Sequence, residues 1–134
     1  MPDGTKNIQI FDASALIHFF QAQYSYAQVK SILQRASQEN RKVLISSVNW
    51  GEVYCIAVKA GGGQNVLTAL DVLPIEVVPV DAQLAQDAGH CKAITHLPYA
   101  DAFAFALAKR YNGQLVTADK DFKVVEDQIS IFWL

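Results

Sequence analysis

Five acidic side chains are spaced along this chain so that a fold could bring them together. Asp101 lies near the start of a predicted helix, and Asp119 and Asp121 directly follow a short apolar run. Asp12 follows another apolar run, and Glu52 lies on a second predicted helix. Carboxylates in close proximity raise one another's pKa unless a cation offsets their charge. Mg²⁺ takes oxygen ligands of this kind and can assist the hydrolysis of a phosphodiester.

Short apolar runs alternate with helical patterns, and this alternation is typical of an α/β fold with a parallel sheet. The predicted strands span residues 7–11, 42–46, 74–80, 114–117 and 129–133. The predicted helices span residues 13–20, 25–40, 64–71, 81–91, 98–111 and 120–126, with a further helix that starts at Ser46 or Ser47 and ends before Gly61. Ser25 is a predicted N-cap. We predict a single domain over residues 1–134, a three-layer α/β/α sandwich with a mostly parallel, about five-stranded central sheet.

The predicted topology brings the acids to one edge of the sheet. In a parallel sheet, ligands bind beyond the carboxyl ends of the strands. Asp12 follows the first strand, and Asp119 and Asp121 follow the fourth. Glu52 and Asp101 lie in the first two turns of helices that start from the same edge. We therefore predict that these five acids form a Mg²⁺ site at this edge, where the ion could orient a phosphodiester and activate water.

Three polar residues are predicted to support this site, and Asp121 is a possible additional member of it. The hydroxyls of Ser14 and Thr117 could hold carboxylates or waters in place. Asn49 lies three residues before Glu52, and this spacing puts both on the same side of a helix.

Each acid also has an ordinary structural role that its own position leaves open. The sole role of Asp12 and of Asp121 could be to cap a helix, and the sole role of Asp101 could be to interact with a helix dipole. Glu52 could be a solvated surface residue. A single acid at one of these positions could arise by chance. The arrival of all of them at one edge of the sheet is much less probable by chance.

Four segments, FDASALI, SSVNWGEV, YADAFAFALA and TADKDF, follow one another in an order and spacing that resemble the PIN-domain ribonucleases. Among these, the chain looks most like the small VapC-type toxins of type II toxin–antitoxin pairs, over about residues 8–132. The resemblance implies that Asp12, Asp101 and Asp119 bind metal and that Glu52 is the fourth acid of the site.

The resemblance also bears on the remaining site residues and on partners. Asp121 matches a position that is often acidic, and Ser14 and Thr117 match small hydroxyl positions. Such enzymes cut single-stranded RNA by Mg²⁺- or Mn²⁺-dependent hydrolysis, pair as homodimers, and are inhibited by a cognate antitoxin that extends a peptide toward the acidic pocket. Residues 1–6 form a short N-terminal extension, which departs from toxins that start almost at the first strand.

The composition fits a globular domain. Apolar residues make up 51% of the chain and charged residues 18%, which argues against disorder. No apolar run approaches the ~18 residues of a membrane span, and the first residues lack the pattern of a signal peptide. We therefore expect a cytoplasmic protein without membrane contact. The net charge of −2 provides no electrostatic argument for tight nucleic-acid binding.

Other residues carry weaker signals. Cys55 and Cys91 are predicted to be buried free thiols, because both lie in apolar helical patterns. His18, His90 and His96 have no spacing typical of metal ligands. The aromatic side chains are predicted to lie in the core (Phe103, Phe105, Phe122, Phe132 and Trp133), and four cations could contact phosphates or only face solvent (Lys109, Arg110, Lys120 and Lys123).

Two other functions remain open from the sequence. An α/β phosphohydrolase or phosphoacceptor with an acidic Mg²⁺ pocket also places an Asp after its first strand, although Asp12 here lacks a second Asp two residues further on. A non-catalytic PIN-like binding module would share the fold, but it has no need of the complete set of acids.

Overall fold

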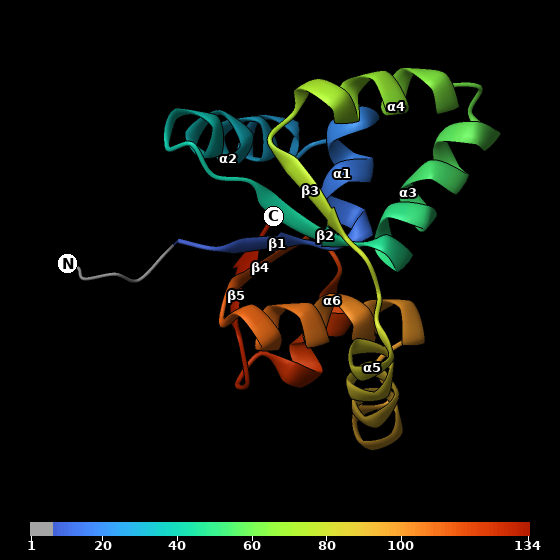
Figure 1. Cartoon of the computed structure of the whole chain (residues 1–134), viewed down its shortest axis with the longest axis vertical. Coiled ribbons are helices and arrows are strands. Elements are labelled where there is room, and N and C mark those ends of the chain that lie inside the picture. The colour runs from blue at the N-terminus through green and yellow to red at the C-terminus, as the bar shows by residue number, and fades with distance from the viewer. Residues whose placement is uncertain (1–6) are drawn as a thin grey trace.

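Five strands and six α-helices alternate along residues 7–134, the part of the chain described by the computed structural model (Figure 1). In chain order they are β1 (Gln9–Phe11), α1 (Ala13–Phe20), α2 (Tyr26–Gln38), β2 (Val43–Ser46), α3 (Ser47–Lys59), α4 (Gly63–Val72), β3 (Ile75–Val78), α5 (Ala82–Thr95), α6 (Tyr99–Tyr111), β4 (Gln114–Thr117), the short 3₁₀ helix η1 (Lys120–Val125) and β5 (Ser130–Trp133). Each strand lies within its predicted range. The predicted extension at 1–6 lies outside the described residues.

The five strands form one sheet in the order β3-β2-β1-β4-β5, and every neighbouring pair is parallel. The chain moves outward from the central β1 to β2 and β3, and then returns to the other side of β1 as β4 and β5. The direction of winding therefore reverses between β1 and β4, where Phe11 is paired with Val116. Ligands of such sheets bind beyond the carboxyl ends of the strands at this reversal point.

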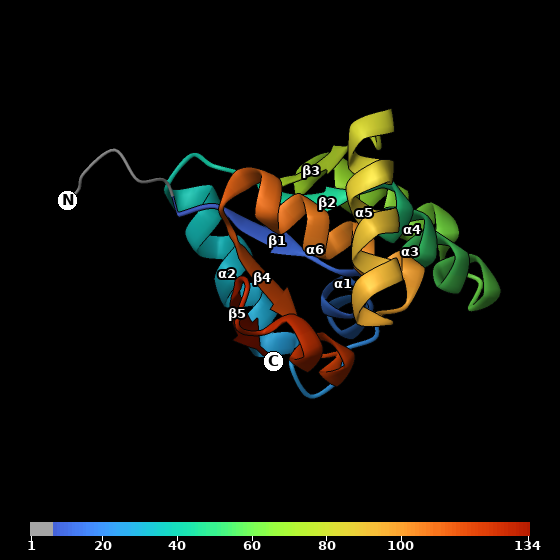
Figure 2. The same cartoon turned by 90° about the horizontal axis from the view of Figure 1, so that it is seen from below.

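Helices cover both faces of the sheet and make three layers. Helices α1 to α4 lie on one face, and α5 and α6 lie on the other (Figures 1 and 2). Successive strand residues point to opposite faces, so Ile10 packs into the core under α5 and α6 while Phe11 packs into the core under α1 and α2. Both faces are apolar, as a parallel sheet between two helical layers requires. The predicted α/β/α sandwich is confirmed.

Helix α6 is the buried centre of one layer. It contacts α3, α5 and the strands β1, β2 and β4, and its residues from Ala102 to Ala108 are all buried. The run AFAFALA is therefore apolar on every side, because every side of this helix meets protein. This packing fixes the N-terminal turn of α6, which carries Asp101, relative to the sheet.

The N-caps of α5 and α2 differ in their hydrogen bonds. Asp81 caps α5 by accepting a hydrogen bond from the backbone N–H of Leu84 at 2.7 Å. Ser25 stands at the N-cap of α2 as predicted, but its side chain makes no capping hydrogen bond. Its hydroxyl is instead 2.7 Å from Nδ1 of His18, which the preceding helix brings alongside it.

Two predictions about burial were wrong. Cys91 is buried, but Cys55 is exposed. The buried residues of α3 are Asn49 and Val53, and Cys55 lies two residues past Val53, which is about 200° around the helix. Trp133 was predicted to lie in the core, yet it is 37% exposed, because it lies on β5, an edge strand of the sheet.

The remaining aromatic predictions agree better with the structure. Phe103, Phe105 and Phe122 are buried in the core under α5 and α6. Phe132 is half-buried against the core on the opposite face. No helix among the described residues is long and apolar enough to cross a membrane.

Candidate active site

The predicted acids meet beyond the carboxyl edge of the sheet. Asp12 follows β1 and Asp119 follows the adjacent β4, so the parallel pairing of these strands places the two acids side by side. Asp101 lies in the first turn of α6 and Glu52 in the second turn of α3. The negative charges of Asp119, Asp12 and Glu52 all act on Asp101, which makes Asp101 the centre of the group.

Three of the acids come especially close together. Asp101, Asp119 and Asp121 each offer a carboxylate oxygen that lies within 4.8 Å of the other two. Asp101 and Asp119 are half-buried, and Asp121 is exposed. This set differs from the predicted trio of Asp12, Asp101 and Asp119. The reason is local: Asp119 caps η1 by accepting a hydrogen bond from the backbone N–H of Asp121 at 2.9 Å, and this turn carries Asp121 to the site.

Asp12 lies deeper than these three and is held from both sides. Its residue is 2% exposed. One oxygen, Oδ1, accepts hydrogen bonds from the Ser14 hydroxyl at 2.7 Å and from the backbone N–H of Ala15 at 3.1 Å. The other, Oδ2, accepts one from the Thr117 hydroxyl at 2.6 Å. The hydroxyls that were predicted to hold a carboxylate therefore hold Asp12, which also caps α1.

The same two hydroxyls position the loop after β4. Ser14 Oγ and Thr117 Oγ1 lie 3.3 Å apart. Ser14 Oγ accepts a hydrogen bond from the backbone N–H of Ala118 at 2.9 Å, and Thr117 Oγ1 accepts one from that of Asp119 at 2.9 Å. One network thus connects Asp12 at the end of β1 to the backbone of Asp119 at the end of β4, and it fixes the spacing of both acids.

Burial and mutual repulsion shift the acids toward the protonated form. Burial raises the pKa of Asp12 to about 6, against the opposing effect of its three hydrogen bonds. The pKa of Asp101 is raised to about 8, first by burial, then by a side-chain hydrogen bond with Asp119, and then by the charges of Asp119, Asp12 and Glu52. A site with this much uncompensated charge favours a bound cation.

Glu52 is held by Asn49, which the sequence placed beside it. Asn49 is fully buried, and its side-chain N–H donates to Glu52 Oε1 at 3.1 Å. It also donates to the carbonyl of Ala100 at 3.0 Å, directly before Asp101. The helical spacing indicated the contact within α3. The contact with α6 has no signal in the sequence, because 51 positions separate the two residues.

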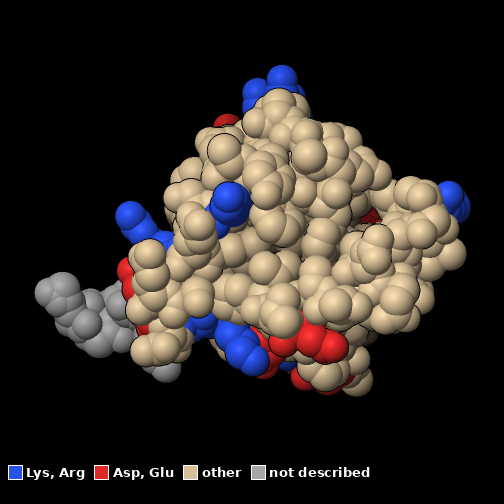
Figure 3. Space-filling model, turned by 90° about the horizontal axis from the view of Figure 1, so that it is seen from above, with Lys and Arg blue, Asp and Glu red and all other residues tan. Residues whose placement is uncertain are grey.

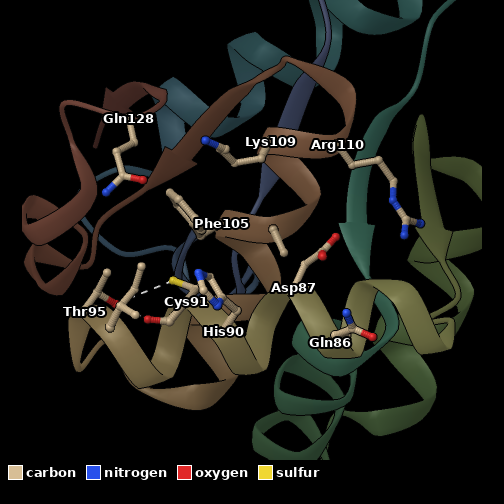
Figure 4. Close-up of a pocket in the computed structure, with 11 residues that line it drawn as sticks. Gln86, Asp87, His90, Cys91, Thr95, Phe105, Lys109, Arg110 and Gln128 are labelled. Atoms are coloured by element: carbon tan, nitrogen blue, oxygen red, sulfur yellow. Dashed lines mark hydrogen bonds between the residues drawn. The ribbon is translucent and has the colours of Figure 1, made fainter.

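The predicted cations divide into two groups. Lys109 and Arg110 line a hollow of about 660 Å³ between α5 and α6, together with His90 and Gln128 (Figure 4). They lie in the last turn of α6, at the opposite end from Asp101, and Arg110 pairs with Asp81 through two contacts of 3.0 Å. The interpretation that these two meet phosphates at the acidic cluster is therefore not supported.

Lys120 and Lys123 are the second group and lie in η1, beside Asp121. Both are exposed, so both could contact a phosphate near the acids. The face formed by α1 to α4 carries few charges, and its Lys and Arg residues are separate spots mostly near the edge (Figure 3). On this face the described residues form no basic patch.

The donor set suits a hard divalent cation. Asp101, Asp119 and Asp121 offer only carboxylate oxygens, which Mg²⁺ and Mn²⁺ accept. Among residues 7–134 this is the only group of three or more acidic, His or Cys side chains close enough to hold a metal ion. The fold and this cluster together define a class of α/β domain with an acidic cluster beyond the carboxyl edge of a parallel sheet.

The model of the PIN domain family matches residues 10–128, and the chain belongs to this family. No curated protein sequence matches the chain. Solved structures with the same fold include a chain of VapBC from Salmonella typhimurium bound to DNA, with a TM-score of 0.73, 18% identity, and coverage of 95% of this chain and 98% of that one.

Two further solved structures share the fold. A chain of a toxin–antitoxin complex from Klebsiella pneumoniae has a TM-score of 0.70 and 24% identity, with 85% of this chain and 89% of that chain covered. The toxin VapC20 from Mycobacterium tuberculosis, which cleaves the sarcin–ricin loop, has a TM-score of 0.69 and 18% identity, with 87% and 94% covered. At these identities the likeness establishes the fold, and the PIN fold is confirmed.

Proposed function

We propose that the protein is a metal-dependent endoribonuclease that hydrolyses RNA phosphodiester bonds, and that it is the toxin of a type II toxin–antitoxin pair. The observation that carries the proposal is the group of carboxylate oxygens of Asp101, Asp119 and Asp121, all within 4.8 Å of one another. Membership of the PIN domain family supports a nuclease. The likeness to VapC20, a toxin that cleaves an RNA loop, supports the choice of RNA.

Asp101 and Asp119 are the central metal ligands in this proposal, because they belong to both the predicted trio and the observed cluster. Asp121 is the third acid of the cluster, and Asp12 lies behind them, where it would contribute negative charge and act on the ion through water. Bound there, Mg²⁺ or Mn²⁺ supplies Lewis-acid chemistry that offsets phosphate charge and makes water more acidic. Glu52 accepts or orients the proton of the attacking water, and Ser14 and Thr117 hold Asp12 in place.

The contacts of Asp12 argue against a phosphoacceptor. An aspartate that attacks phosphorus needs an oxygen that can approach the phosphoryl group. Both oxygens of Asp12 accept hydrogen bonds, from Ser14, Ala15 and Thr117, and the residue is 2% exposed. These contacts suit a carboxylate that stays in place and contributes charge.

The partners in this proposal are RNA, a cognate antitoxin protein and a second copy of the chain. The toxin–antitoxin complexes that share the fold support the antitoxin. A groove between α1, α3 and α4 could accept the apolar side of such a protein; its lining includes Ile17, Phe20, Val53, Ile56, Ala57 and Val66. Sedimentation of the purified chain tests the homodimer, which should have twice the mass of the 14.8 kDa chain; a single species of monomer mass would contradict it.

The decisive experiment compares the wild-type protein with Asp101→Asn on a labelled single-stranded RNA in the presence of Mg²⁺ or Mn²⁺. We expect cleavage by the wild type, none with a chelator, and a loss of at least ~10³-fold in Asp101→Asn, because a carboxylate at the centre of the metal site is lost. Asp87→Asn is the control, because Asp87 is an exposed acid on α5 outside the cluster.

Calorimetric titration of both proteins with Mn²⁺ separates the alternatives. Binding that disappears in Asp101→Asn supports the metal site. Full cleavage by Asp101→Asn would refute the mechanism. Metal binding without cleavage of any RNA would favour a non-catalytic module, and a stable phosphorylated aspartate after incubation with a phosphoryl donor would favour a phosphoacceptor.

A further inference from the structure

The side chain of Asn49 is a fully buried amide at the contact between three elements. It lies in the first turn of α3, directly after β2, and it faces the start of α6. A buried amide that lacks hydrogen bonds is strongly destabilising, so the hydrogen-bond partners of Asn49 indicate its structural role. All of its partners lie at the edge of the acidic cluster or hold the amide toward it.

Every hydrogen-bonding group of this amide has a partner. The side-chain Nδ2 donates to Glu52 Oε1 at 3.1 Å and to the carbonyl oxygen of Ala100 at 3.0 Å. The side-chain Oδ1 accepts a hydrogen bond from the Ser46 hydroxyl at 2.6 Å. The same hydroxyl accepts from the backbone N–H of Asn49 at 3.1 Å, which closes the N-cap of α3.

These partners permit only one orientation of the amide. Two acceptors, the Glu52 carboxylate and the Ala100 carbonyl, face Nδ2, and a hydroxyl donor faces Oδ1. Rotation by 180° would turn Oδ1 toward the two acceptors and leave both without a donor. The amide is therefore a rigid link, and it orients Glu52 by holding Oε1 alone. Glu52 Oε2 accepts no hydrogen bond from the residues that the structure describes.

The link matters because of what lies next to it. Ala100 directly precedes Asp101, the acid on which Asp119, Asp12 and Glu52 all act. One amide group thus contacts both the carboxylate of Glu52 and the backbone that carries Asp101. A free Glu side chain samples several rotamers, whereas a carboxylate held through Oε1 keeps its second oxygen at one place relative to Asp101.

We propose that Asn49 is a positioning residue that fixes Glu52 relative to Asp101 and thereby sets where Glu52 takes or orients the proton of the attacking water. This role rests on the proposed ribonuclease function. Asn49 does not contact the reacting atoms in this role, and it acts through Glu52. Its removal leaves Glu52 present but without the hydrogen bond that fixes its direction.

The test is a double-mutant cycle of Asn49→Ala and Glu52→Gln, with RNA cleavage measured as kcat and KM. We expect Asn49→Ala to lower kcat by roughly 10²-fold, within the range for loss of a general base, with KM changed less than about threefold. The double variant should cleave at the rate of Glu52→Gln alone, within about threefold, because Asn49 has nothing left to position. Multiplied losses would mean that the two residues act independently, and this would overturn the proposal.

Gln9→Ala is the matched control for the loss of a buried amide. Gln9 is 6% exposed at the amino end of β1, the opposite end of this strand from Asp12, and there it donates to Gln114 and accepts from Arg41. We expect a similar loss of stability in urea unfolding and no loss of kcat. If Gln9→Ala loses as much kcat as Asn49→Ala, the effect of Asn49 is one of stability alone and the proposal fails.

A measurement without activity tests the contact itself. In metal-free protein labelled with ¹⁵N, the side-chain NH₂ signals of Asn49 should be protected from exchange and should shift in Glu52→Gln. Unprotected and unshifted signals would contradict the link. A wild-type protein that cuts no RNA while these signals are protected would refute the proposed function and leave the link in place. A wild type that cuts RNA while Asn49→Ala retains its kcat would refute the positioning role alone.

Discussion

At the scale of single residues, the acidic edge of the sheet holds carboxylates that are buried close together, and their negative charges repel one another unless a cation offsets them. Asp12 is buried with three hydrogen bonds, and Asp101 is half-buried among acids. Their pKa values are raised to about 6 and about 8, from an ordinary value of 3.8. Without a cation, the folded protein therefore holds a proton at neutral pH, mainly on Asp101, that the unfolded chain would release.

The stability of the metal-free protein should fall as the pH rises from about 4 to about 8. A raised pKa means that the folded state binds more protons than the unfolded state in this window, so the free energy of unfolding decreases with increasing pH. Asp12 alone contributes about 3 kcal/mol between its two pKa values. Urea unfolding in a chelator across this pH range measures the effect, and Asp12→Asn should flatten it. An increase in stability over the same range would contradict the assignment.

The hydroxyl of Thr117 connects Asp12 directly to the backbone of Asp119. Replacement by valine keeps the shape, removes the donor to Asp12 and leaves the backbone N–H of Asp119 without its acceptor. We expect a loss of about 1–3 kcal/mol in urea unfolding, together with weaker Mn²⁺ binding. Thr68→Val on the exposed side of α4 is the control and should leave metal binding unchanged. Equal metal affinity in Thr117→Val would show that the hydroxyl does not position the acids.

At the scale of elements, α6 and β4 meet at a junction that has no room for a side chain. Asn112 ends α6 in the left-handed conformation, with φ of 50°. A Cβ on the next residue, Gly113, would collide with Ile10 Cδ1 and would lie 2.9 Å from the carbonyl oxygen of Ile8. The close approach of β1 at this point sets the position of α6, and through it the position of Asp101.

Gly113→Ala should therefore destabilise the protein, by roughly 1–3 kcal/mol, because the new Cβ would collide with the side chain of Ile10 in β1 and crowd the backbone of Ile8, directly before this strand. Gly89→Ala is the matched control: Gly89 lies within α5, and a Cβ there would meet nothing within 4 Å. We expect this control to stabilise the protein by up to about 1 kcal/mol through helix propensity. Thermal and urea unfolding of both variants give the two values. Equal behaviour of the two glycines would contradict the packing argument.

At the scale of the whole molecule, the fold brings its acids together at the cost of electrostatic repulsion, and the proposed cation would offset that cost. Only the folded chain holds Asp101, Asp119 and Asp121 within 4.8 Å of one another, so we expect a divalent ion to bind the folded state in preference to the unfolded one. In this proposal, the acids that weaken the metal-free protein at high pH become the source of its stabilisation by metal.

Mg²⁺ or Mn²⁺ at 100 times its dissociation constant should raise the free energy of unfolding at pH 8 by about 2.7 kcal/mol. The gain should be smaller at pH 5, where protons occupy Asp12 and Asp101 and compete with the metal. Urea unfolding with and without the ion, at both pH values, measures it. Asp101→Asn should lose most of the gain, and a gain that does not depend on pH would indicate binding elsewhere.

Several features of this protein follow from local sequence patterns. The alternation of apolar strands and helices predicts a parallel α/β sheet, since strands such as VLIS are apolar on both faces only when helices cover both. Because all strands then end at one edge, residues directly after β1 and β4, and residues at the starts of α3 and α6, are placed there. Asp12, Asp119, Glu52 and Asp101 are therefore predictable members of one site.

Only the tertiary structure decided which atoms of this set come closest. The turn of η1 brings Asp121 into the tight cluster, whereas hydroxyls from β4 and α1 hold Asp12 behind it. The contact between Asn49 and Ala100 spans 51 positions, and no periodic pattern extends so far. The sequence by itself determines which residues reach the edge, because strand ends and helix starts are local features. Side-chain direction and depth of burial depend on packing between distant segments, and only the fold determines them.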